Sequence, residues 1–99
     1  MAKRLIATHP GEILREELEE RGISLNRLSR DIRVPLSRIS MIVNGKRAMT
    51  PDTALRLERY FGAEAQFWMN LQTQYDLGIA SQSAAQIKRE VIPADRNAA

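Results

Sequence analysis

Apolar residues recur at helical spacing along the chain, in short segments that polar residues, glycine and proline separate. Leu25, Leu28 and Ile32 show this pattern at positions i, i+3 and i+7, and similar sets follow further along. No run alternates β-branched or aromatic residues with polar ones, as a half-buried strand would. The chain is therefore predicted to be all-α.

Capping residues and helix breakers predict where the helices begin and end. Ser24 and Thr50 are good N-caps, Pro51 suits a first helical turn, and Gly22 and Gly62 suit left-handed positions after a helix. The expected helices run from about His9 to Gly22, from Ser24 to before Pro35, from Pro35 or Leu36 to Asn44, from Thr50 to Gly62 and from Glu64 to Tyr75. The sequence Asp76-Leu77-Gly78 is expected to end the fifth helix, with an amphipathic stretch over residues 81–91 and a frayed tail over residues 94–99.

The second and third predicted helices are short and joined by a tight turn, which is the arrangement of a helix-turn-helix between about Ser24 and Asn44. In this geometry the apolar residues that lock the two helices together are Leu28, Ile32, Val34, Ile39 and Ile42. The leading end of the second helix of the motif then faces outward, where its residues reach base edges in the major groove of DNA.

On that outward edge Arg38 is the best candidate for reading a base, because a guanidinium pairs with both acceptors of a guanine. Ser37 and Ser40 can hydrogen-bond a base or a phosphate, and Leu36 and Met41 can contact a thymine methyl. Leu36 is an equally good core residue, and Arg38 has the alternative of a solvated surface arginine.

Further candidate contacts lie outside this helix. The residues after it are polar or cationic and suit the phosphate backbone, and the free N–H groups that begin the first helix of the motif can hold a phosphate. Arg27 on that helix is a weaker candidate, with solubilisation of the surface as its alternative role. These candidates are Ser24, Asn26, Arg27, Asn44, Lys46 and Arg47.

The charge distribution agrees with a polyanionic partner. The net charge is only +3, but residues 22–50 carry six cations against one acid, whereas residues 10–21 and 51–80 carry balances of −3 and −2. Such asymmetry favours binding of nucleic acid on one face. The alternative is an ordinary solvated surface with uneven charge.

Four motifs in order resemble the HigA family of antitoxins, whose helix-turn-helix is of the Cro/repressor type: THPGEILREEL, SRISMIVNGKR, TPDTALRLERYFG and FWMNLQTQYDL, between Thr8 and Leu77. The resemblance implies a five-helix Cro/repressor-like core, a homodimer, and an antitoxin that represses its own operon. It also implies a HigB-like partner, a toxin of the RelE type that cleaves mRNA. The family usually has glycine in the turn where this chain has Arg33. We expect residues 1–78 to form the DNA-binding domain and residues 79–99 a C-terminal helical extension and tail.

Two further groups of residues suggest protein contacts. The first predicted helix carries an acidic face that suits a basic toxin, with a solvated face paired to Arg15 and Arg21 as the alternative. The glutamates of this face are Glu12, Glu16, Glu19 and Glu20. Trp68 is expected in the core or in a dimer seam, and Ile87 and Val91 need a covering surface that a second copy can supply.

Other classes of function find little support. The chain has no cysteine and one histidine, His9, which suits a helix start better than a metal site. No cofactor is expected, and no catalytic set can be assembled. No signal peptide or membrane span is predicted, so a cytoplasmic, nucleoid-associated protein is expected. The open alternatives are a stand-alone helix-turn-helix regulator without a toxin and a helical adaptor that binds only proteins.

Overall fold

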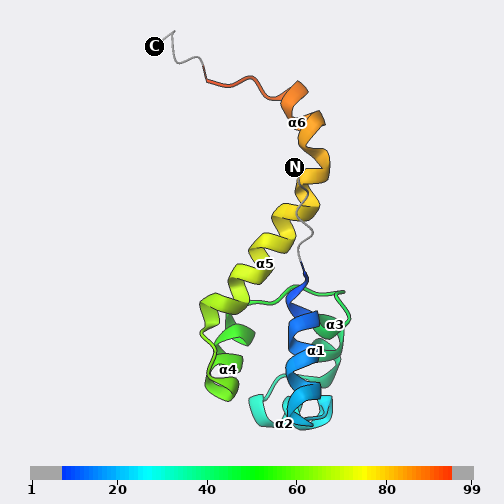
Figure 1. Cartoon of the computed structure of the whole chain (residues 1–99), viewed down its shortest axis with the longest axis vertical. Coiled ribbons are helices and arrows are strands. Elements are labelled where there is room, and N and C mark those ends of the chain that lie inside the picture. Colours follow the sequence, from blue (N-terminus) through cyan, green and yellow to red (C-terminus); the bar gives the residue numbers. More distant parts are fainter. Residues whose placement is uncertain (1–7, 95–99) are drawn as a thin grey trace.

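Residues 8–94 are described by a computed structural model, and the regular structure in this part of the chain is helical, with no strand. The helices are α1 (Pro10–Arg21), α2 (Leu25–Ile32), α3 (Leu36–Val43), α4 (Pro51–Phe61), α5 (Ala65–Ala80), a short 3-10 turn (Ser81–Ser83) and α6 (Ala84–Glu90) (Figure 1). The all-α prediction is confirmed, and α1 to α4 have nearly the predicted bounds. The predicted tail lies mostly outside the described residues.

The helix ends follow from local hydrogen bonds. Ser24 Oγ accepts the backbone N–H of Arg27 at 3.0 Å, and Thr50 Oγ1 accepts that of Thr53 at 3.4 Å, so both residues are N-caps as predicted. Gly22 is left-handed (φ 66°) and ends α1. His9 begins α1, where its Nδ1 accepts the N–H of Gly11 at 2.9 Å.

The predicted end of the fifth helix is wrong. α5 continues through Asp76-Leu77-Gly78 to Ala80. Gln72 Nε2 donates to Asp76 Oδ1 at 2.9 Å, which supports this part of the helix from the preceding turn. One glycine costs a helix only about 1 kcal/mol relative to alanine, and its apolar neighbours Leu77 and Ile79 are acceptable in a helix.

The core lies between α1 to α4 and the first half of α5. Trp68 is 1% exposed and belongs to the core cluster, to which every one of these helices contributes apolar side chains. The loop after α3 is fixed to the core, because Met49 is buried and its N–H donates to the buried Gln72 Oε1 at 2.7 Å. The other buried apolar residues are Leu14, Leu18, Leu28, Ile32, Val34, Ile39, Ile42, Val43, Ala54 and Leu57.

The C-terminal part projects away from this bundle. The second half of α5, the 3-10 turn and α6 extend beyond the other helices, and every residue from 81 to 94 is exposed (Figure 1). The radius of gyration is 17.6 Å, compared with about 13 Å for a compact chain of this length. We call residues 77–94 the C-terminal arm. Its exposed large apolar residues are Leu77, Ile79, Ile87, Val91 and Ile92.

Gly11 sets how closely α1 and α3 approach. It is buried, and a methyl group at its Cα would overlap the backbone carbonyl of Ile42 in α3. That obstacle is backbone, so a larger residue forces the two helices apart. The position therefore requires glycine even though it lies inside a helix.

We expect Gly11→Ala to lower the free energy of unfolding by about 1–3 kcal/mol, because a methyl group has no space between the helices. Gly78→Ala is the matched control: it makes the same substitution within α5, where alanine should raise helix stability by up to about 1 kcal/mol. Urea denaturation followed by circular dichroism measures both. A Gly11→Ala protein as stable as the wild type would contradict this account of the α1–α3 contact.

Candidate DNA-binding surface

α3 is held by one flank and exposed along the other. Ile39, Ile42 and Val43 are buried, whereas Leu36 and Met41 are 41% and 42% exposed. The exposure of Leu36 favours the surface interpretation over the core interpretation. Because the buried residues face α1 and α2, the leading end of the helix and its exposed flank remain open to a ligand.

The polar candidates on and after α3 differ in what they contact. Within residues 8–94, the side chains of Ser37, Arg38, Lys46 and Arg47 make no hydrogen bond or ion pair. Ser37 is exposed and Arg38 half-buried, and both cationic residues of the loop are exposed. These groups keep their full hydrogen-bonding capacity for a ligand.

Other candidates already make contacts with part of their side chain. Arg27 Nε lies 3.4 Å from Asp31 Oδ2, one turn further along α2. Ser24 uses its hydroxyl oxygen as the N-cap, which leaves the backbone N–H groups that begin α2 as the donors at this end. Ser40 Oγ and Asn44 Nδ2 are 3.5 Å apart, and the Asn44 side chain also contacts α1.

Arg33 occupies the turn between α2 and α3 in the left-handed conformation, with φ 59° and ψ 47°. Arginine thus takes a position at which the HigA pattern usually has glycine, at the cost that a Cβ carries in this region. The turn keeps its shape through contacts on both sides. Ser29 Oγ donates to the Val34 carbonyl at 2.7 Å, and Arg56 Nη1 donates to the Ile32 carbonyl at 2.9 Å.

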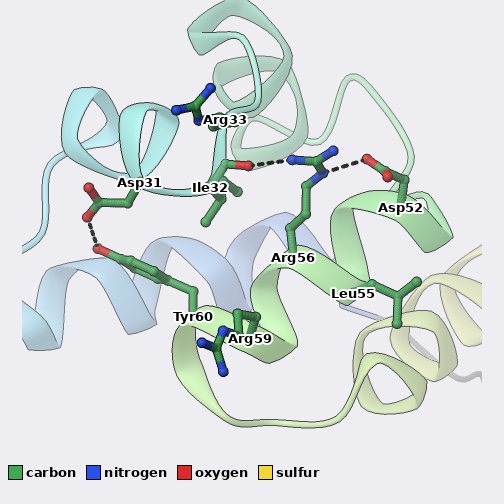
Figure 2. A pocket seen from close by; sticks show the side chains of 8 residues that line it. All are labelled: Asp31, Ile32, Arg33, Asp52, Leu55, Arg56, Arg59 and Tyr60. Atoms are coloured by element: carbon green, nitrogen blue, oxygen red, sulfur yellow. Dashed lines mark hydrogen bonds and ion pairs between the residues drawn. The ribbon is translucent and has the colours of Figure 1, made fainter.

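These contacts from α4 were not predicted from the sequence. Arg56 is held by Asp52 at 2.9 Å, and Tyr60 Oη donates to Asp31 Oδ2 at 2.6 Å, so α4 fixes the end of α2 at two points (Figure 2). The hydrogen bond from Tyr60 lowers the pKa of Asp31 and raises that of the tyrosine itself. An open groove of about 750 Å³ lies between these side chains. The Arg56–Ile32 and Tyr60–Asp31 hydrogen bonds join residues 24 and 29 positions apart, and no sequence spacing signals them.

The acidic face of α1 is exposed at all four predicted glutamates. The alternative interpretation needed Arg15 and Arg21 as their partners. Arg21 instead lies 3.4 Å from Glu17, and Arg15 is directed to the end of α3. Within residues 8–94, none of these four glutamates forms an ion pair with Arg15 or Arg21.

The three candidate dimer residues differ in burial. Trp68 is 1% exposed and belongs to the core of the protomer, which leaves its side chain no surface for a partner. Ile87 and Val91 are 48% and 57% exposed on the arm. A shallow apolar depression of about 380 Å³ lies between Leu77 and Ile87.

His9 joins α1, α5 and the loop that follows α3. Its ring is 5% exposed and packs edge-on against Tyr75, with 4.8 Å between the ring centres. Burial lowers the pKa of His9, and a hydrogen bond with the Arg47 backbone and the charges of Asp76 and Glu12 oppose this effect in part. The neutral imidazole is therefore the form that fits this site.

The pattern of the helix-turn-helix family matches residues 14–68. The chain therefore belongs to the helix-turn-helix family, a class of DNA-binding regulators. Within residues 8–94 no helix has the length and apolarity that a membrane crossing needs, and no three metal-ligating side chains gather.

Comparison with individual proteins narrows this class and confirms the resemblance to HigA antitoxins. A solved HigA-family addiction module antidote protein from Coxiella burnetii is 43% identical, with a TM-score of 0.84 over 91% of this chain and 100% of that one. The HigA antitoxin of Pseudomonas aeruginosa, solved with the higBA promoter, is 44% identical, with a TM-score of 0.83 over 89% and 98%. Virulence-associated protein I of Dichelobacter nodosus is 54% identical over 82% of this chain and 76% of its own length.

We expect Arg38→Ala to cost about 1–3 kcal/mol of binding to the cognate site and to relax specificity, because a base contact is lost. Lys46→Ala should instead weaken binding to all sequences and lower the salt dependence, as the loss of a phosphate contact does. Fluorescence anisotropy with cognate and random duplexes measures both. An equal loss on the two duplexes for Arg38→Ala would assign this residue to the phosphate backbone.

Stability is expected to depend on pH through His9. The unfolded chain binds its proton near the ordinary pKa of 6.5 and the folded chain only at lower pH. The unfolding free energy should thus fall as the pH drops through and below that value, and should level off below the folded pKa. His9→Asn keeps an N-capping side chain without a titrating group, so its denaturation profile between pH 8 and pH 5 should lack this component. Identical profiles for the two proteins would contradict the assignment.

Proposed function

We propose that this chain is the DNA-binding antitoxin of a type II toxin–antitoxin module, which represses its own operon and neutralises a HigB-like, mRNA-cleaving toxin. The observation that carries the proposal is the exposure of the leading end and outer flank of α3, whose other flank is locked in the core. A helix presented in this way fits the major groove of a duplex.

The surrounding charges support operator binding. The segment of residues 22–50 carries a surplus of five positive charges, and Lys46 and Arg47 lie exposed directly after α3. Such groups displace the counterions of DNA, so affinity should fall steeply as salt rises. In the proposed complex Arg38 and its outward neighbours on α3 read the bases, and the start of α2 and the loop after α3 hold phosphates.

The arm supports a homodimer. Its large apolar residues are exposed in the protomer, and a second copy is the covering surface that the sequence itself supplies. In a symmetric dimer the two reading helices would lie about 34 Å apart, one turn of DNA, and would prefer a palindromic operator.

The acidic face of α1 supports contact with a toxin. An RNA-cleaving toxin is expected to be basic, and the four exposed glutamates offer it a surface of opposite charge. This face lies on α1, whereas the residues proposed to read DNA lie on α3, so the two partners would contact different residues of one protomer.

The proposed function is tested by titrating the DNA upstream of this gene in gel shifts at two salt concentrations, with and without the neighbouring gene product. Sequence-specific, salt-sensitive DNA binding that changes when the neighbouring gene product is added supports the antitoxin proposal. Specific binding without any effect of the product would indicate a stand-alone regulator, and binding without sequence preference would indicate an adaptor. The triple variant Glu16→Lys, Glu19→Lys and Glu20→Lys should still bind DNA, and the neighbouring gene product should no longer alter that binding.

We expect Ile87→Glu to weaken the dimer at least about tenfold, because a buried apolar contact becomes a buried charge. Gln82→Glu adds the same charge at another exposed position of the arm and is the control. Sedimentation velocity across the micromolar range measures both. A wild-type chain that is monomeric at micromolar concentration would exclude the homodimer.

A further inference from the structure

Arg15 of α1 reaches across to the end of α3. Its Nη2 donates to Asn44 Oδ1 at 2.8 Å and lies 3.4 Å from the carbonyl oxygen of Val43. The two side chains are 29 positions apart in the sequence, and both belong to exposed residues. Arg15 has glutamates at i−3 and i+4 on its own helix as alternative partners, yet its guanidinium lies against α3.

This contact fixes which way the Asn44 amide points. A guanidinium has only donors, so the Asn44 atom that faces it is the carbonyl oxygen. The amide nitrogen is turned to the opposite side, where Ser40 Oγ lies 3.5 Å away, at the limit of a hydrogen bond. The N–H donors of Asn44 are therefore directed away from α1 and remain almost entirely available.

Asn44 continues the exposed edge of α3. It follows the last residue of that helix, so Ser40 and Ser37 precede it by one and two turns on the same side. Met41, three positions before it, is also exposed. The donors that Arg15 orients therefore lie on the surface proposed to face the duplex.

We propose that Arg15 is a positioning residue for DNA binding, which holds Asn44 so that its amide donates to a phosphate oxygen of the operator. This inference rests on the proposed operator binding. Reading an adenine would require both the oxygen and the nitrogen of the amide to face the base. Because the oxygen faces α1, Asn44 contributes affinity that is the same for all sequences, and Arg15 contributes only through Asn44.

A double-mutant cycle on the full chain tests this coupling. Arg15→Gln, Asn44→Ala and the double variant are compared with the wild type by anisotropy, on the operator and on a random duplex, with thermal unfolding measured for each. Loss of one hydrogen bond predicts a roughly 5–10-fold weaker complex for each single variant. The double variant should bind no more weakly than Asn44→Ala, and the loss should be similar on both duplexes.

Three controls separate positioning from other roles. Arg21→Gln removes the same charge from the same helix, at a site that contacts Glu17 and the Phe61 ring, and should leave affinity within about twofold. Arg15→Gln should keep the wild-type salt slope, since this residue makes no phosphate contact itself. Asn44→Asp keeps an acceptor for Arg15 but loses the donors, so it should bind at least as weakly as Asn44→Ala while remaining as stable as the wild type.

Each contrary result overturns the inference. Losses that multiply in the double variant would show that Arg15 acts independently of Asn44. A salt slope lowered by about one would make Arg15 a phosphate contact in its own right. If Arg15→Gln and Arg21→Gln weakened DNA binding equally, the loss of net positive charge alone would explain the effect of Arg15→Gln. If the wild type shows no preference for the operator, the proposed function fails and this inference fails with it.

Discussion

The structure depends on how closely α3 is packed against α1. At Gly11 the absence of a side chain lets α1 approach the backbone of Ile42, and this approach buries Ile39, Ile42 and Val43 on one side of α3. A helix of only eight residues would not be stable by itself. Because its inner flank is fixed so firmly, its outer flank can remain free of internal contacts and available to a ligand.

The turn before α3 shows how long-range contacts replace a local preference. Arg33 adopts a backbone conformation that glycine adopts without strain. The carbonyl that ends α2 is bound by Arg56, and Tyr60 holds Asp31 near the same place (Figure 2). α4 thus stabilises the turn through the end of α2, while α1 packs directly against α3, so two helices distant in sequence fix the motif.

Much of this fold could be predicted from the sequence, because its helix ends depend on neighbours. Ser24, Thr50, Gly22 and Gly62 act within a few positions of themselves, and the structure uses them as expected. Prediction failed where a local signal was overruled, as when α5 ran past Gly78. Sequence spacing gave no prediction for side-chain pairs that form only in the tertiary fold. The Arg15–Asn44 hydrogen bond is an example, because its two residues lie on helices that meet only after folding.

The proposed roles assign the toxin, the operator and the second copy to different residues of the protomer. The glutamates of α1 at i−3 and i+4 of Arg15 share the side of the helix with this arginine, whose guanidinium lies against the end of α3. Glutamates near the proposed operator face repel phosphates, and the exposed cations Lys46 and Arg47 after α3 oppose this repulsion. The apolar residues of the arm lie beyond the bundle, where a second copy can cover them without touching α3. A protomer of this size has a small core, so contacts between two arms would stabilise the protein and set the spacing of the reading helices together.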